Sequence, residues 1–488
     1  MKRKEIIFSI TALVVLLTGC LTLNTKSVQA AQSGETIAVE TYEKPVSMLA
    51  QSSGSAPVLI SQDKTQLIDD IYKYSFIFKV GDGAFDKIGV YRVVKENQSV
   101  PIKAKNAVIL VHGDTSDFDS EFLMSTMSDK VSVCHSLGIY LAQNNVDVWG
   151  VDRRWTFVPD YYLETTDPYC YIDGCYFMED WDTALHLSDI KIAVKFAREI
   201  RDETGSGSDK IFMLGHSRGA ALAYAYANDE TQIDECSRDL IGIIPVDMVY
   251  KFDPDDPAQT PLIENSCLKC QKLQEKFNSG IFYSDKAVGL KYIAYLAALF
   301  PDKESDIIPG FTNQEAVWFV LSATYMTEDD PFYDDSEMTS PPVPFYHYCA
   351  GTFNKFGLPT GLQFTNSDYM LDFAFAVPSF QSLGEAIDVE ALRCSDDTPY
   401  DDHLGEIIIP VFYVGAAGGY GKYGVYTTTL LGSYDKDKPD NNDVDTLIVE
   451  LYPPEAVALD YGHIDLLFAD DAESLVWKPI YKWIKETH

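Results

Sequence analysis

The sequence predicts an α/β fold in which helices cover both faces of a mostly parallel sheet. Short β-branched runs alternate with helical segments along most of the 488 residues. At Gly215–Gly219 a buried-type strand, KIFML, passes directly into a run of helix-forming residues, AALAYAYA. Hydrophobic residues make up 46% of the chain, which is enough to fill at least one large core. Right-handed crossovers between such elements produce parallel strands with both faces covered.

The individual strands are short apolar runs that end in glycine or polar residues. Strands are predicted over 88–94, 106–113, 146–152, 210–214, 239–247, 406–419 and 445–463. Apolar residues at 193, 196, 197 and 200 repeat with the period of a helix, so 189–203 should lay one stripe against the sheet. Further helices are predicted over 136–145 and 473–486.

The charge balance excludes some partners. The chain carries 38 Lys and Arg against 74 Asp and Glu, a formal net charge of -36, which repels phosphate backbones and anionic membrane surfaces. Nucleic acid is therefore not an expected partner.

Acidic clusters at 253–257, 395–402 and 435–445 raise calcium binding as an alternative, but none has the spacing of an EF-hand loop, and solvated loops are the favoured interpretation. We expect no cofactor and no metal.

The first thirty residues read as a targeting segment. Three basic residues precede an apolar run, 6–17, which is the layout of a secretory signal and too short for a membrane span. The sequence around Cys20, Leu-Thr-Gly-Cys, resembles a bacterial lipobox, so Cys20 would be lipidated and tether the protein to a membrane. The alternative is cleavage after Ala30, which would release a free protein. Either way the protein is expected to be secreted or held at the cell surface.

The cysteines agree with export. Eight remain beyond Cys20, an even set compatible with up to four disulfides in an oxidising compartment. Cys267 and Cys270 have metal-ligand spacing, but no second pair completes a site, so a disulfide is favoured. Residues 31–57 are largely small and polar and are predicted to be a spacer.

Ser217 is the candidate nucleophile. It lies between Gly215 and Gly219, where the predicted strand turns into the predicted helix. A serine on so sharp a turn adopts a strained backbone and presents Oγ above the sheet edge, and a side chain at either glycine would collide with a neighbouring element. The helix that begins there points free N–H groups at the same place. The alternative is a purely structural turn.

These motifs resemble those of the α/β-hydrolases. The likeness is carried by AVILVHGD, NNVDVWGVDRRW, LGHSRGAAL and DYGHIDLLFADDAESLVWKPIYKWI, which fall within 85–250 and 405–488. More narrowly, the order of these motifs is similar to the acid-lipase and esterase branch. The resemblance implies a core formed by 58–249 and 405–488, with a helical cap inserted at 250–404.

The resemblance also implies the partners of the serine. His463 follows the last strand, where the family carries its general base. The usual position of the acid, after the preceding strand, holds only small residues. Asp247 ends the strand before that one, as in pancreatic-type lipases, and adjacent strand ends lie about 5 Å apart, so Asp247 is the predicted acid. The alternatives left open are Asp435, Asp437 and Asp443.

The oxyanion hole is expected from two backbone N–H groups. One belongs to Arg218, after the nucleophile, and the other to Asp114, after the His-Gly pair, with Thr115 as the fallback because a carboxylate near an oxyanion is unfavourable.

The aromatic-rich 250–404 segment is either a roof that binds an acyl or aryl group or simply a cap with its own core.

The sequence therefore predicts an exported serine hydrolase that cleaves small or medium hydrophobic carboxylic esters through an acyl-enzyme on Ser217. A peptidase or amidase would use the same three residues. A non-catalytic binding protein, or a scaffold anchored through Cys20, would keep the fold without the chemistry.

Overall fold

The computed structural model describes residues 56–159, 175–323, 343–435 and 443–487. By its internal contacts the chain divides into 1–43 and 44–488, and every described residue belongs to the second unit. The predicted signal segment, with Cys20 and Ala30, and most of the predicted spacer lie outside the described residues.

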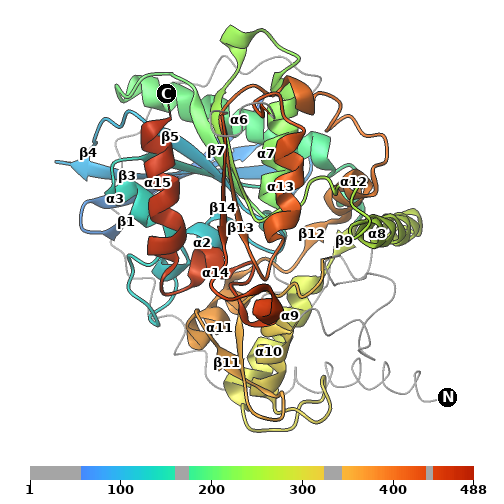
Figure 1. The fold of residues 1–488 in the computed structure, drawn as a ribbon. Coiled ribbons are helices and arrows are strands. Elements are labelled where there is room, and N and C mark those ends of the chain that lie inside the picture. Colours follow the sequence, from blue (N-terminus) through green and yellow to red (C-terminus); the bar gives the residue numbers. More distant parts are fainter. Residues whose placement is uncertain (1–55, 160–174, 324–342, 436–442, 488) are drawn as a thin grey trace. The chain divides into compact units, whose positions relative to one another are not determined.

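A central sheet organises the described residues (Figure 1). Its strands run in the order β1-β2-β3-β6-β5-β7-β8-β13-β14, with β4 paired to β3. In this sheet order, the strands from β6 through β5, β7, β8 and β13 to β14 are parallel to one another. The strands β1, β2, β3 and β4 pair antiparallel with their neighbours. The strands are β1 (Val58–Ile68), β2 (Ile71–Lys79), β3 (Lys87–Asn97), β4 (Val100–Pro101), β5 (Ala107–Val111), β6 (Asp147–Asp152), β7 (Ile211–His216), β8 (Leu240–Val246), β13 (Val411–Ala416) and β14 (Val444–Val449).

Each predicted strand is present, but the one expected over 406–419 covers only β13, Val411–Ala416. The strand expected over 445–463 ends at Val449, because 454–459 turns into a 3-10 helix behind Pro453. The β1–β2 hairpin was not predicted. Its outer strand, β1, contains no buried residue, so its sequence lacks the clear two-residue alternation of a half-buried strand.

Helices pack on both faces of the sheet, as predicted (Figure 1). The alternation of side chains along β5 shows how: Ile109 and Val111 face one apolar core, and Val108 and Leu110 face the other. The first core includes α6 (Thr183–Glu203) and α7 (Arg218–Glu230), with α13 (Gly421–Thr429) beside them. The second includes α2 (Phe118–Phe122), α3 (Leu137–Gln143) and α15 (Lys478–Glu486).

The segment between β8 and β13 is mainly helical, as its sequence pattern predicts. Its helices are α8 (Thr260–Asn278), α9 (Lys286–Leu299), α10 (Asn313–Ser322), α11 (Ser367–Ala376) and α12 (Leu383–Cys394). Two short strand pairs join them, β9 (Tyr283–Ser284) with β12 (Gln381–Ser382) and β10 (Gly351–Phe353) with β11 (Pro359–Leu362). Helix α8 packs along α12, and α9 packs on α10 and α11. The helices thus form two groups, which stand apart in Figure 1.

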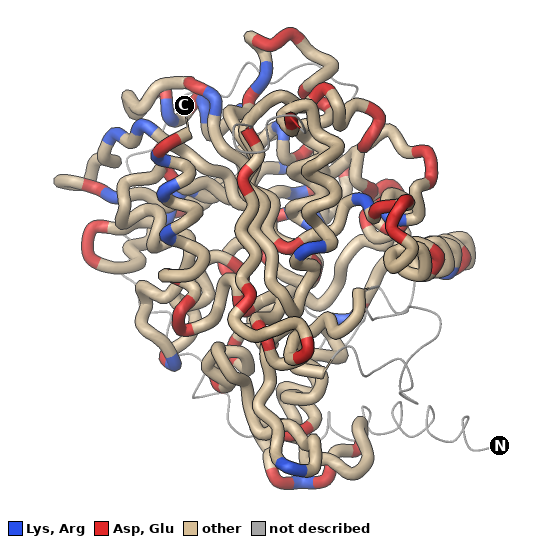
Figure 2. The backbone as a smooth tube through the Cα atoms, in the orientation of Figure 1, with Lys and Arg blue, Asp and Glu red and all other residues tan. Residues whose placement is uncertain are grey.

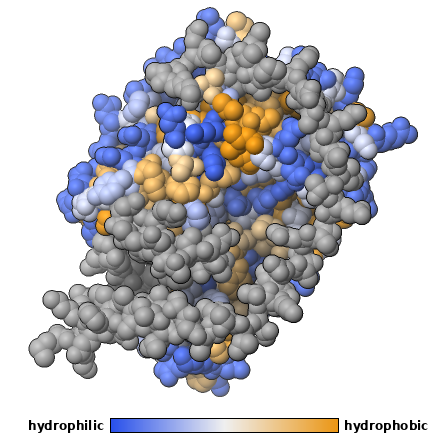
Figure 3. Space-filling model, turned by 180° about the vertical axis from the view of Figure 1, so that it is seen from behind, coloured by the Kyte–Doolittle hydropathy of each residue, from blue (hydrophilic) through white to orange (hydrophobic). Residues whose placement is uncertain are grey.

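Acidic residues are spread over many loops and helices (Figure 2). Seen from behind, apolar residues show at several places between hydrophilic ones, most strongly in the upper part of the view (Figure 3). Within the described ranges, no helix combines the length and apolar character needed to cross a bilayer. In the same ranges, no group of three or more His, Cys, Asp or Glu side chains is placed to hold a metal ion.

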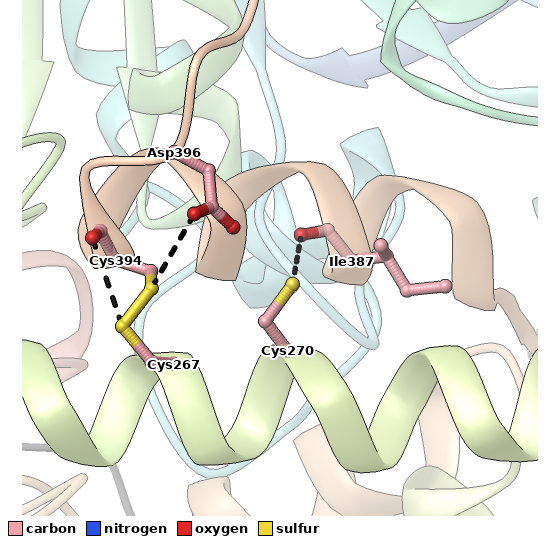
Figure 4. The surroundings of a disulfide bond; sticks show 5 residues. All are labelled: Cys267, Cys270, Ile387, Cys394 and Asp396. Carbon is pink, nitrogen blue, oxygen red and sulfur yellow. Dashed lines mark hydrogen bonds between the residues drawn. A yellow bond between two sulfur atoms is a disulfide. The ribbon is translucent and has the colours of Figure 1, made fainter.

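The cysteines are used more sparingly than their number allows. Cys267 is bonded to Cys394, which ties α8 to the C-terminal end of α12 (Figure 4). One turn further along α8, the Cys270 thiol contacts the carbonyl oxygen of Ile387 at 3.8 Å and is free. Cys175 is also disulfide-bonded. The free thiols among the described residues are Cys134, Cys236, Cys270 and Cys349, so the maximum of four disulfides is not reached.

Breaking the Cys267–Cys394 bond should destabilise the protein. The bond closes a chain segment of 127 residues, and the loss of a disulfide across a long loop costs about 2–5 kcal/mol. We expect Cys394→Ser to lower the free energy of unfolding by this amount in urea titrations. Cys236→Ser, at an exposed free cysteine, is the matched control and should leave the midpoint unchanged. Equal midpoints for the two variants would contradict a stabilising role for the bond.

Candidate active site

Ser217 occupies a strained turn between β7 and α7. Its backbone angles are φ 53° and ψ -123°, a conformation that L-residues rarely adopt and that costs on the order of 1–3 kcal/mol. The flanking glycines make the turn feasible. A Cβ on Gly215 would lie 2.0 Å from the carbonyl oxygen of Gly219, and a Cβ on Gly219 would lie 1.9 Å from that of Val111. The residue types predicted for the turn are therefore those that its geometry demands.

Asp247 and His463 meet in the buried interior. The Nδ1 atom of His463 lies 2.6 Å from Oδ2 of Asp247. Asp247 follows β8, and His463 lies in the loop before α14 (Asp465–Phe468). The aspartate carboxylate accepts hydrogen bonds from the backbone N–H groups of Ala416, Tyr420 and Gly421. Since a carboxylate only accepts, Nδ1 of His463 carries the proton and Nε2 is left as a proton acceptor.

The small residues after β13 have a physical explanation. A Cβ on Gly419 would lie 2.0 Å from Oδ2 of Asp247. The carboxylate from the neighbouring strand end therefore fills the space that a side chain at position 419 would need. The position that seemed vacant in the sequence is occupied by Asp247.

The alternative acids lie elsewhere or are outside the described residues. The carbonyl oxygen of Asp443 accepts from the N–H of Val411, at the opposite end of the parallel strands from Ser217. Asp437 lies outside the described residues. The Nδ1 atom of His463 is already engaged by Asp247, so it offers no proton to Asp435. The structure thus brings Asp247 to His463.

The loop after β5 is held by Arg153, at the end of β6. Its Nη2 donates to the carbonyl oxygens of His112 at 2.7 Å and Gly113 at 2.6 Å, and its Nη1 pairs with the buried carboxylate of Glu385. In a trans peptide the C=O and the following N–H point in opposite directions. Because Arg153 holds the carbonyl of Gly113, the N–H of Asp114 points away from Arg153.

Asp114 is the best placed donor of this loop. The N–H of Gly113 donates to Glu121, and the N–H of Thr115 donates to Gln381, so both neighbours are engaged. Asp114 itself lines the same cavity as Ser217 and Arg218. This arrangement favours Asp114 over the fallback, Thr115.

The Asp114 carboxylate forms an ion pair with Arg218. The Arg218 guanidinium binds it through two hydrogen bonds of 2.9 and 3.0 Å. Burial alone would raise the pKa of Asp114, but the charge and hydrogen bonds of Arg218 outweigh this and hold the pKa well below its ordinary value. The concern that this carboxylate would oppose negative charge at the serine is met by the ion pair.

His216 and Glu121, to which the sequence analysis assigned no role, complete the site. His216 lies next to the serine but cannot act as a base, because both of its ring nitrogens are engaged. Its Nδ1 contacts Glu121 at 2.8 Å, and its Nε2 contacts the carbonyl oxygen of His463 at 3.2 Å. Both partners are acceptors, so both nitrogens of His216 carry protons when Glu121 is ionised. Burial lowers the pKa of His216, but the Glu121 carboxylate more than offsets this, and the pKa lies above its ordinary value.

His216 also acts on His463 directly. Their rings are stacked with centroids 4.6 Å apart. Burial lowers the pKa of His463, the nearby His216 lowers it further, and Asp247 opposes both, so that the pKa remains below its ordinary value. His463 is consequently neutral near pH 7, the state in which its Nε2 can accept a proton.

The remaining histidines contact other parts of the fold. His112 and His186 are buried, and burial lowers the pKa of each. Both ring nitrogens of His347 lie at hydrogen-bond distance from carbonyl oxygens, those of Phe345 and Asp460. His135 contacts the carbonyl oxygen of Phe468, and His403 pairs with Glu406. His488 lies outside the described residues.

A single cavity of about 440 Å³ is lined by Ser217, His463, Arg218 and Asp114 together. Its walls come from the strand ends and from the helical 250–404 segment, including Phe373 of α11. Other aromatic residues of that segment, such as Trp318 and Tyr369, are buried in the apolar core. Some aromatic residues of the segment thus form core, whereas Phe373, Tyr346 and Tyr348 line the cavity.

Comparisons with known proteins bear on the fold. No protein-family model matches the sequence, and no curated protein sequence matches it. Among solved structures, a proposed lipase from Sulfolobus solfataricus is similar, with a TM-score of 0.53 and 16% identity over 88% of this chain and 100% of that chain. A soluble variant of the monoglyceride lipase of Saccharomyces cerevisiae gives a TM-score of 0.43 and 15% identity, over 83% of this chain and 94% of that one.

The sheet topology and the first of these similarities define the fold class. This chain has the α/β-hydrolase fold, with a mostly parallel sheet between helices. At this level of identity the likeness extends to the fold alone, and the narrower branch suggested by the sequence motifs stays a prediction.

Removing the His216 charge should raise the pKa of His463. In His216→Asn the stacked cation is gone, so protonation of His463 becomes less unfavourable, whereas Asp247 remains. We expect NMR titration of the His463 ring to give a higher pKa in the variant than in the native protein. His403→Asn, at a partly exposed histidine, is the control and should not shift the titration. A lower or unchanged pKa in His216→Asn would refute the assigned charge of His216.

Proposed function

We propose that this protein is a serine hydrolase that cleaves carboxylic esters through an acyl-enzyme on Ser217. The observation that supports it most is the Asp247–His463 pair, which opens into the same cavity as a serine on a strained, glycine-flanked turn. The fold alone does not carry this proposal, because α/β-hydrolase folds host many activities.

The first half of the reaction follows from the proton positions. The Ser217 hydroxyl attacks the ester carbonyl carbon while Nε2 of His463 accepts its proton. The imidazolium that forms is stabilised by Asp247, which holds Nδ1–H. When the tetrahedral intermediate collapses, Nε2 gives the proton to the leaving alcohol and the acyl group remains on Ser217.

The second half repeats these steps with water. Nε2 of His463 takes a proton from a water molecule that attacks the acyl carbonyl, and returns it to Ser217 as the acid is released. No redox group or cofactor is required for either half. The negative charge on the carbonyl oxygen forms twice, once in each half.

We assign the backbone N–H groups of Arg218 and Asp114 to that oxygen. Arg218 begins α7, so its N–H lies at the positive end of a helix dipole. The Arg153 contacts to the preceding carbonyl groups fix the peptide before Asp114. Each such donor is worth on the order of 3 kcal/mol of transition-state stabilisation.

The two rival functions differ in what they expect. A peptidase or amidase would use the same residues and would turn over peptide anilides in preference to p-nitrophenyl acyl esters. A binding protein would leave Ser217 unreactive toward a fluorophosphonate probe. The ordered Asp247–His463 contact and the neutral state of His463 favour a reactive serine over the binding protein.

Export is part of the proposal. The basic and apolar N-terminal segment, the Cys20 context and the disulfide Cys267–Cys394 support a location outside the reducing cytosol, either lipid-anchored through Cys20 or released by cleavage after Ala30.

Substitution of the three proposed catalytic residues tests the mechanism. Ser217→Ala and His463→Ala should each lower kcat for p-nitrophenyl butyrate by about 10⁴-fold or more, because the nucleophile or its base is lost. Asp247→Asn should lower kcat by roughly 10³–10⁴-fold because it no longer fixes the tautomer of His463.

Asp435→Asn is the matched control for the acid, since it removes a carboxylate from an alternative position. It should keep native activity, and circular dichroism should show all four variants folded. Equal losses for Asp435→Asn and Asp247→Asn would move the acid assignment, and a fully active Ser217→Ala would end the proposal.

The pH dependence should follow His463. Protonated His463 cannot accept the serine proton, so activity is present above its pKa and lost as the pH falls through it. Because burial and His216 lower this pKa below the ordinary 6.5, we expect the acid limb of the kcat/KM profile for a neutral ester to have its midpoint below pH 6.5. A midpoint above pH 6.5 would be inconsistent with this environment.

A further inference from the structure

The cavity above Ser217 has walls of two chemical kinds. One part is lined by aliphatic and aromatic side chains of α9, α10 and α11 and of the loop between α9 and α10. These residues are Leu290, Ile293, Ile307, Ile308, Val320, Leu321 and Phe373. The other part holds the charged side chains of α8 and α12, together with those beside the serine, although Leu273, Leu383 and Ala386 of the same two helices also line it. As α8 packs on α12 and α9 packs on α10 and α11, the two kinds of wall come from the two helical groups.

Helix α9 connects the two parts of the cavity. Lys286, Leu290 and Ile293 lie at i, i+4 and i+7 and all line the cavity, so one face of the helix runs along it. Gly289, on the same face, has open space where a Cβ would be. The lysine is in the first turn and the apolar residues are in the turns that follow.

Most charges in the polar part are paired. Glu390 of α12 accepts from Lys269 of α8 at 2.8 Å and from Arg393 at 3.0 Å. Burial by itself raises the pKa of Glu390, but the positive charges of Lys269 and Arg393 outweigh this and lower the pKa to about 2. Arg218 is paired with Asp114. With Lys286, four Lys and Arg side chains line the cavity, against the three carboxylates of Asp114, Glu121 and Glu390. Glu121 is paired with His216.

Lys286 supplies an unpaired part of this excess. Among the described residues it has no ion-pair or hydrogen-bond partner. Its side chain lines the cavity and is exposed to solvent there. Partial loss of solvent inside the cavity, and then the charge of Lys269, lower the pKa of Lys286 to about 8, while Asp114 and Glu390 act in the opposite direction. The lysine therefore remains mostly protonated at pH 7.

A cation excess inside the cavity is unusual for this chain, which has a formal net charge of -36. Among the described residues the Lys286 ammonium has no counter-ion, and an anion bound in the cavity would form a charge-assisted hydrogen bond with it. Elongated apolar walls a few residues away suit a hydrocarbon chain. The two features lie along one face of a single helix, at a spacing that one small amphiphile can span.

We infer that the cavity binds an amphiphilic substrate, with its hydrocarbon chain against α9, α10 and α11 and an anionic phosphate or carboxylate group at Lys286. This inference deepens the proposed function and rests on it for the identity of the reaction, although binding of the anion does not depend on turnover. The substrate class is an ester that carries both an apolar chain and an acidic group.

Binding can be measured without chemistry in Ser217→Ala. Isothermal titration with octyl phosphate, octanoate and 1-octanol compares ligands that share a chain and differ in charge. We expect at least one of the two anions to bind about tenfold or more tightly than 1-octanol, the range expected for a charge-assisted hydrogen bond. The tighter anion identifies the acidic group as a phosphate or a carboxylate.

The lysine is tested in the same background. Lys286→Met keeps the length of the side chain and removes its charge, so it should abolish the preference for the anion, whereas Lys286→Arg should retain it. Lys303→Met is the matched control, because Lys303 lies in the same 250–404 segment, pairs with Asp306 at the surface and does not line the cavity. Equal binding of all three ligands, or an anion preference that survives Lys286→Met, would overturn the inference.

A turnover experiment separates this inference from the proposed function. With native Ser217, the ratio of kcat/KM for 1-butanoylglycerol 3-phosphate to that for 1-butanoylglycerol should fall about tenfold in Lys286→Met. Hydrolysis of both esters with no effect of Lys286→Met on the ratio would refute the anion site and leave the hydrolase standing. Tight octyl phosphate binding without hydrolysis of any ester would do the reverse.

Discussion

The contact between Asp247 and His463 is the interaction on which the site depends. It joins the end of β8 to the loop before α14 through a distance of 2.6 Å, and it fixes which ring nitrogen is free. The carboxylate is itself held by three backbone N–H groups. Ser217 can be strained because this arrangement and the flanking glycines determine its surroundings. Without a buried, well-hydrogen-bonded acid, a neutral imidazole at this position would have no fixed orientation.

Charge around His463 is arranged on two sides. Asp247 stabilises its protonated form, whereas the stacked His216, sustained by Glu121, disfavours it. The result is a base that stays neutral near pH 7 but has a partner ready for the charge that it acquires. Glu121 also accepts a hydrogen bond from the N–H of Gly113, so one carboxylate connects the loop after β5 to His216, which stacks on His463.

Much of the site follows from the sequence. Ser217 and Asp247 follow neighbouring parallel strands, whose ends meet at one edge of the sheet. His463 is predicted from the resemblance to the α/β-hydrolases, and it lies in a loop beyond the end of β14. The β1–β2 hairpin is not predicted because β1 contains no buried residue, so its sequence lacks the alternation of a half-buried strand. The roles of Glu121 and Lys286 could not be predicted for a different reason. They depend on contacts between segments that are distant in the sequence, and the residue type alone does not indicate such contacts. Glu121 and His216, for example, are 95 residues apart.

The space around Gly419 limits where the acid of this site can stand. Since a side chain at 419 would overlap the Asp247 carboxylate, acids at the two positions are mutually exclusive within this backbone. Moving the acid to the turn after β13 would therefore demand two coordinated replacements, one at Gly419 and one at Asp247.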